Sequence, residues 1–74
     1  MGMLAINKNM HVVIITYPDG RVEEWPYFSL YNAIAFAQNI VEDDHYNKII
    51  EDERRVVQLK KADGTYKKIM RKKL

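Results

Sequence analysis

The stretch "VVIITYPDGRVEEW", residues 12–25, predicts a β-hairpin. Residues 11–17 form a β-branched run whose two alternating sets of side chains are both apolar. This is typical of an interior strand covered on both sides, or covered by a helix and a partner. The Asp-Gly pair that follows is a strong hairpin signal, because Gly20 accepts a positive φ without penalty. Pro26 cannot donate to a ladder, so the returning strand ends there or lies at a sheet edge.

A second stretch, "VVQLKKADGTYKKI", residues 56–69, matches the first at a constant offset of 44 residues and predicts a second hairpin of equal length. As a sign of common origin the match is weak, since any two hairpins with Asp-Gly turns look alike. The charges are inverted, because Glu23 and Glu24 align with Lys67 and Lys68. If these strands are neighbours, within one chain or between two, each opposite pair favours the contact by roughly 0.2–1 kcal/mol.

The stretch "SLYNAIAFAQNIVEDD", residues 29–44, predicts one helix. Ser29 suits the N-cap position, where a side-chain oxygen accepts a bond from an early backbone N–H. Three acidic residues, 42–44, oppose the helix dipole, so we expect the helix to end near them. One helical face is apolar and consists of Leu30, Ala33, Ile34, Ala37, Ile40 and Val41.

Three short β-branched runs follow and predict three more strands: "YNKII" (residues 46–50), "RRVVQLKK" (54–61) and "TYKKIM" (65–70). A second helix over residues 45–61 is the alternative. The expected order is ββαβββ, a single small α+β domain with one helix packed on a mainly antiparallel sheet. We assign residues 1–9 to a flexible N-terminal segment, 10–70 to the domain and 71–74 to a basic C-terminal tail.

The order of strand, Asp-Gly turn, strand and F-S-x-x-x-A-x-x-F-A resembles that of many small hairpin-plus-helix modules, among them the arm-binding domains of phage-type integrases. The residues that carry the resemblance are Asp19, Gly20, Phe28, Ser29, Ala33, Phe36 and Ala37. These are turn and packing residues, so the resemblance implies a hairpin-plus-helix fold and no function.

The composition places the chain among small globular proteins. It has 74 residues, of which 47% are hydrophobic, and no cysteine. That apolar content argues against disorder, and the lack of cysteine suits a reducing cytoplasm. The longest uncharged run, residues 25–41, is too short and too polar for a membrane span. We therefore expect a soluble, cytoplasmic protein with no membrane association.

The basic end of the chain is the first candidate binding surface. Residues 60–74 carry seven Lys or Arg and one Asp, whereas the net charge of the whole chain is only +2. Two basic hairpin arms could follow a phosphate backbone while a tyrosine stacks on an unpaired base. Lysines on edge strands also prevent aggregation. Nucleic-acid binding is therefore the alternative function, through Lys60, Lys61, Tyr66, Lys67, Lys68, Arg71, Lys72 and Lys73.

The second candidate surface is aromatic. The segment "WPYFSLY" places four aromatic residues within residues 25–31, and Trp and Tyr dominate protein interfaces. We expect Trp25 and Phe28 in the core and Tyr27 and Tyr31 partly exposed. Together with the acidic strand, this predicts a protein interface formed by Trp25, Tyr27, Tyr31, Glu23 and Glu24.

Catalytic groups are few. Ser29 is explained by helix capping, and His11 and His45 fit no metal-binding pattern. The carboxylates of residues 42–53 could gather Mg²⁺ or Ca²⁺, yet no DxDxDG loop is present. We therefore expect no enzyme and no cofactor. The leading hypothesis is a small non-catalytic interaction protein that forms a homodimer and binds another protein.

Overall fold

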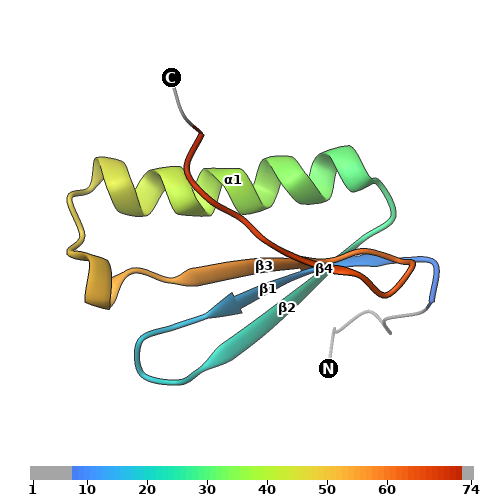
Figure 1. Ribbon diagram of the computed structural model, residues 1–74, viewed down its shortest axis with the longest axis horizontal. Helices are drawn as coiled ribbons and strands as arrows, with labels where there is room; N and C mark the ends of the chain where they lie inside the picture. Colours follow the sequence, from blue (N-terminus) through green and yellow to red (C-terminus); the bar gives the residue numbers. More distant parts are fainter. Residues whose placement is uncertain (1–7, 73–74) are drawn as a thin grey trace.

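The computed structural model describes residues 8–72, so most of the predicted N-terminal segment and the last two residues of the predicted tail lie outside the described residues. The described chain forms a four-stranded antiparallel sheet with one helix packed on one face (Figure 1). The α+β fold class is thereby confirmed. The elements are β1 (His11–Thr16), β2 (Val22–Tyr27), α1 (Leu30–Tyr46), the 3-10 turn η1 (Glu51–Glu53), β3 (Val56–Lys60) and β4 (Tyr66–Lys68).

The strand order is β2-β1-β3-β4, so the two hairpins meet through their first strands. Both predicted hairpins are confirmed, but their predicted equal length is wrong, since six residue pairs join β1 and β2 and only three join β3 and β4. Their registers are equivalent: Ile14 lies opposite Glu24, and Gln58 lies opposite Lys68. Their Asp-Gly turns also match, since Gly20 and Gly64 both have φ of 93°. This left-handed conformation strongly favours glycine.

The two hairpins are related by an approximate two-fold axis perpendicular to the sheet. Ile14 pairs with Gln58, which is its own counterpart at the offset of 44 residues. The equivalent turn bonds have equal lengths, because the N–H of Tyr17 donates to Arg21 O at 2.8 Å and that of Lys61 donates to Thr65 O at 2.8 Å. The axis therefore passes between β1 and β3, and the charge-inverted strands β2 and β4 become the two opposite edges.

The predicted strand over residues 46–50 is wrong, and so is the alternative helix over residues 45–61. Helix α1 continues to Tyr46 and ends in a Schellman arrangement. In it, the N–H of Lys48 donates to His45 O at 3.0 Å and that of Ile49 donates to Asp44 O at 3.1 Å. Lys48 takes the left-handed conformation, with φ of 58°, at a position usually held by glycine.

The core lies between α1 and one face of the sheet. Ser29 is the N-cap of α1, as predicted, because its Oγ accepts the N–H of Asn32 at 3.2 Å. The small Ala33 and Ala37 let the helix approach the sheet closely, and Ile69 reaches the core from beyond β4. The buried cluster is Val13, Ile15, Ala33, Ala37, Ile40, Val57, Leu59 and Ile69.

The expected burial of Trp25 and Phe28 is wrong, since their exposed fractions are 46% and 68%. Trp25 lies on edge strand β2, at the rim of the helix, and Phe28 lies in the short connection before α1. Phe36 takes the inner position instead, with its ring centroid 5.6 Å from Trp25 and 5.5 Å from Tyr27. The expected partial exposure is confirmed for Tyr27, which is half-buried, and exceeded by Tyr31, which is 80% exposed.

Candidate interaction surface

The sheet has a second face, turned away from α1 (Figure 1). Paired residues of neighbouring strands point to the same face, so the register defines three rows on it. Within residues 8–72, no helix or strand lies over this face. We call it the open face, and it consists of Val22, Thr16 and Val56; Glu24, Ile14, Gln58 and Lys68; and Pro26, Val12, Lys60 and Tyr66.

The open face has an accessible apolar part. Val22 and Val56 are 57% and 44% exposed and flank Thr16 in the first row, and Ile14 in the second row is half-buried. Val12, in the third row, is buried. The accessible apolar surface therefore consists of Val22, Val56 and part of Ile14, and Tyr66 is exposed at the far corner of the face, on β4.

The two edges of the open face carry opposite charges. Glu24 lies on β2. Lys68 lies on β4, and Lys60 lies on the neighbouring strand β3. None of these three belongs to the ion pairs found within residues 8–72, which are Asp19–Arg21, Asp44–Arg55 and Glu42–Arg71. Because β2 and β4 are not neighbours, the predicted pairing of their charges within one chain is wrong. Pairing between two chains stays open.

Both sheet edges are poor sites for adding a strand. Residue pairs along a hairpin alternate between hydrogen-bonded and non-hydrogen-bonded ones. Because the N–H of Tyr17 donates to Arg21 O, the pair of Val12 and Pro26 is a non-hydrogen-bonded one, and the nitrogen of Pro26 points to the free edge. A proline there removes a donor, as expected for the edge strand that the sequence predicted. At the other edge, β4 has only three residues, two of them lysines. Short, lysine-rich edges resist edge-to-edge pairing.

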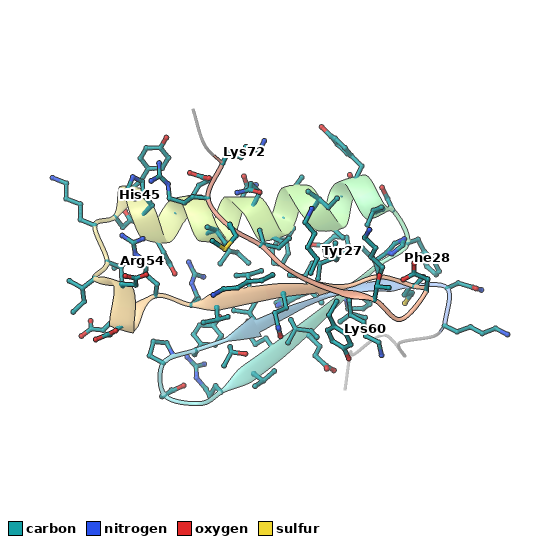
Figure 2. All side chains as sticks on the ribbon, in the orientation of Figure 1. Tyr27, Phe28, His45, Arg54, Lys60 and Lys72 are labelled. Carbon is teal, nitrogen blue, oxygen red and sulfur yellow. The ribbon has the colours of Figure 1, made fainter. Side chains whose placement is uncertain are left out.

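The predicted protein-interface residues do not form one surface. Glu23, Trp25 and Tyr27 lie together on the helix side of β2, where Figure 2 labels Tyr27. There Glu23 Oε1 accepts the hydroxyl of Tyr17 at 2.9 Å and the indole N–H of Trp25 at 3.3 Å. The other two are elsewhere, with Glu24 on the open face and Tyr31 on the solvent side of α1.

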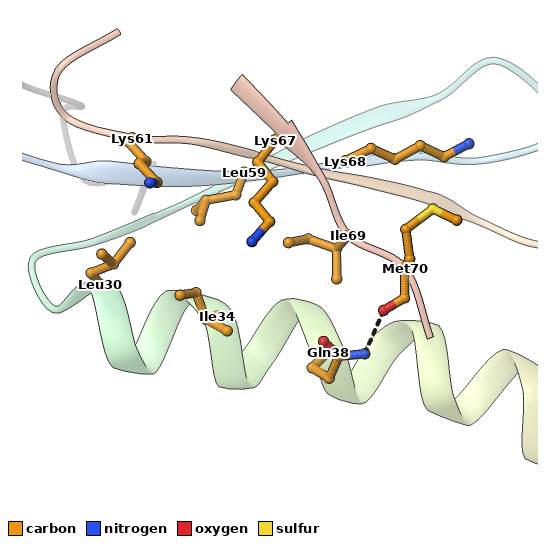
Figure 3. Close-up of a pocket in the computed structure, with 9 residues that line it drawn as sticks. All are labelled: Leu30, Ile34, Gln38, Leu59, Lys61, Lys67, Lys68, Ile69 and Met70. Carbon is orange, nitrogen blue, oxygen red and sulfur yellow. Dashed lines mark hydrogen bonds between the residues drawn. The ribbon is translucent and has the colours of Figure 1, made fainter. Parts of the chain in front are cut away.

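The predicted nucleic-acid residues are divided between three places. Lys60, Tyr66 and Lys68 share the open face, where Lys60 Nζ lies 5.8 Å from the centroid of the Tyr66 ring. Lys61 and Lys67 lie on the helix side, beside a groove of about 300 Å³ between α1 and β4 (Figure 3). Arg71 and Lys72 lie along α1, and Lys73 is outside the described residues.

The chain after β4 crosses back over α1. Gln38 Nε2 donates to the carbonyl of Met70 at 2.7 Å (Figure 3), and the N–H of Lys72 donates to Glu42 Oε2 at 3.0 Å. Arg71 Nε lies 3.8 Å from Glu42 Oε1. The hydrogen bond from the N–H of Lys72 and the positive charge of Arg71 lower the pKa of Glu42. Of the basic tail, Arg71 is therefore paired with a carboxylate of α1 at the protein surface.

An ion pair that the sequence analysis missed joins the end of α1 to the start of β3. Arg55 Nη2 donates to Asp44 Oδ1 at 2.6 Å, and the backbone N–H of Arg55 donates to Asp44 Oδ2 at 2.9 Å. Burial disfavours the charged carboxylate, but the bonds from Arg55 outweigh it and lower the pKa of Asp44. One signal was available, because Asp44 continues the buried helical line of Ala33, Ala37 and Ile40.

The candidate catalytic residues have structural partners. Nδ1 of His11 accepts the N–H of Ala62 at 3.1 Å, and the ring of His45 packs edge-on against Tyr46 at 5.5 Å. Across residues 8–72, no three His, Asp or Glu side chains gather as metal ligands do. In the same part of the chain, no helix combines the length and apolar character needed to cross a membrane.

No family model, curated protein or solved structure matches this chain. The fold and the surface define a small α+β domain whose sheet, within residues 8–72, is covered by a helix on one face only.

Proposed function

We propose that this chain is a small, cytoplasmic, non-catalytic interaction protein that works by binding proteins through the open face, beginning with a second copy of itself. The observation that supports this best is the accessible apolar surface of Val22, Ile14 and Val56 on the open face, next to charges of opposite sign that belong to no ion pair within residues 8–72. An apolar patch bordered by polar groups is the usual anatomy of a protein interface. A domain of this size also gains stability from a bound partner.

The size of the open face sets the strength of the association. Four strands about 4.8 Å apart, with at most six residues rising about 3.3 Å each, give a face of at most about 400 Å², because β4 has only three residues. Two such faces bury at most about 800 Å² in total, below the roughly 1,200 Å² at which stable specific interfaces begin, so the contact is of the weak, transient kind. We therefore expect a dimer that forms at micromolar concentrations and dissociates on dilution.

Sedimentation velocity from about 5 to about 500 µM tests the proposal, because this range brackets a weak dimer. We expect wild type to pass from monomer to dimer. Val56→Lys should raise the dissociation constant at least about tenfold, because it buries an unpaired charge in the interface. Ile50→Lys is the control, since Ile50 is 63% exposed and lies outside the open face.

A wild type that stays monomeric throughout, or equal effects of the two variants, would contradict the proposal.

Nucleic-acid binding is less favoured, because only three of its candidate residues share the open face. With two cations on that face, the log–log salt slope would be about −2 rather than the −6 or so of seven phosphate contacts. Micromolar binding of labelled DNA or RNA that persists at about 200 mM salt would put this alternative first.

A further inference from the structure

We propose a specific geometry for the dimer: the two open faces pack against each other around a two-fold axis that runs parallel to the strands, between β1 and β3. In this geometry Glu24 of each copy meets Lys68 of the partner subunit. The inference rests on the proposed function and adds the partner's orientation. It follows from the strand order, the register and the inverted charges of the two hairpins.

Edge-to-edge assembly does not produce a closed dimer with opposite charges in contact. Pairing β2 of one copy with β4 of the next uses two different surfaces, so it continues into an open chain or a ring. Pairing β2 with β2, or β4 with β4, closes a dimer but brings like charges together. Pro26 and the short β4 weaken both edges further. Neither edge therefore gives a closed dimer with complementary charges, whereas the open face does.

Two symmetric face-to-face arrangements keep the strands of the two sheets aligned, with the two-fold axis either along or across the strands. The backbone favours neither arrangement, because the approximate two-fold symmetry of the hairpins exchanges β2 with β4. The charges separate them. An axis across the strands stacks β2 on β2, so Glu24 faces Glu24. An axis along the strands stacks β2 on β4, so Glu24 faces Lys68.

With the axis along the strands, each row of the open face packs on the same row of the partner subunit, with the order of the strands reversed. Ile14 then faces Gln58 of the partner subunit, and Thr16 faces Val56 of the partner subunit. Packed sheets lie about 10 Å apart and are rotated by about 30°, a gap that Glu and Lys side chains can span from both sides. The dimer thus contains a central strip in which apolar side chains pack against uncharged polar ones, and two symmetry-related Glu24–Lys68 pairs.

A charge-swap series measured by sedimentation velocity at low salt tests this geometry. Glu24→Lys or Lys68→Glu alone should raise the dimer dissociation constant about five- to tenfold, because two attractive pairs become repulsive. The double variant Glu24→Lys/Lys68→Glu should return to the wild-type value. The matched control is Glu23→Lys/Lys67→Glu, on the same two strands but on the helix side, which should leave association unchanged in a folded protein.

The outcomes separate the geometry from the proposed function. If wild type stays monomeric, both fail. If wild type dimerises and Val56→Lys prevents it, but the double variant stays as weak as the single ones, the open face is the interface and the axis is wrong. A helix-side swap that weakens association as much as the single open-face variants do would also overturn the geometry.

Discussion

Replacing Asp44 by alanine lowers the free energy of unfolding by about 3 kcal/mol at pH 7. The side chain of Asp44 is 10% exposed and that of Arg55 is 27% exposed, so removing the carboxylate leaves a half-buried guanidinium without its partner. The pair also joins the end of α1 to the start of β3, across residues that form no regular strand. A domain of this length has roughly 4–11 kcal/mol in total, so the loss is large. Urea denaturation followed by circular dichroism measures it.

The same pair makes stability depend on pH. Because the pKa of Asp44 is lowered in the folded protein, its contribution is present above the ordinary carboxyl pKa of about 3.9 and is lost as the pH falls through the lower folded value. The stability difference between wild type and Asp44→Ala should therefore shrink steadily below about pH 4.

The neighbouring Asp43→Ala is the control, because Asp43 is exposed and its side chain makes no hydrogen bond or ion pair within residues 8–72. It should change the free energy of unfolding by less than about 0.5 kcal/mol. Equal losses for the two variants would show that Asp44 is not the residue that clamps the helix.

Replacing Ile69 by alanine lowers the free energy of unfolding by about 2–4 kcal/mol. Ile69 is 7% exposed and packs into the core beyond the end of β4, where its N–H donates to Val57 O at 2.9 Å. Deleting its side chain opens a cavity against α1 and β3. The measurement is again urea denaturation at neutral pH.

Met70→Ala is the matched control for Ile69→Ala. Met70 is the next residue and is 65% exposed, and its contact with Gln38 uses the backbone carbonyl, which the substitution keeps. We expect a change below about 0.5 kcal/mol. If Ile69→Ala were equally harmless, the C-terminal segment would not be docked on the fold.

The hairpins and the helix could be predicted from the sequence because their signals are local. Asp-Gly turns, β-branched runs and the Ser29 cap each act within a few residues. The acidic residues 42–44 indicated the end of the helix to within two residues of Tyr46, but the segment after it was misjudged. Lys48 adopts a left-handed conformation where glycine is usual, and the isoleucines after it resembled a strand.

The candidate surface depends on strand order, which no local signal gives. Once β1 pairs with β3, the charge-inverted strands become opposite edges, and Glu23 and Glu24 point to different faces. The sequence analysis therefore identified the charged residues of the two strands but assigned them to the wrong surfaces. The basic tail divides for the same reason, with Lys68 on the open face, Lys67 by the groove and Arg71 beside Glu42.

The most direct test of the open face as the interface is a dilution series of ¹⁵N-labelled full-length protein, from about 1 mM to about 20 µM, followed by two-dimensional NMR. We expect concentration-dependent shifts at the amides of Ile14, Val56 and Gln58, with none at Tyr31 and Asn39 on the solvent side of α1. Shifts confined to α1, or spectra that do not change with concentration, would contradict the account.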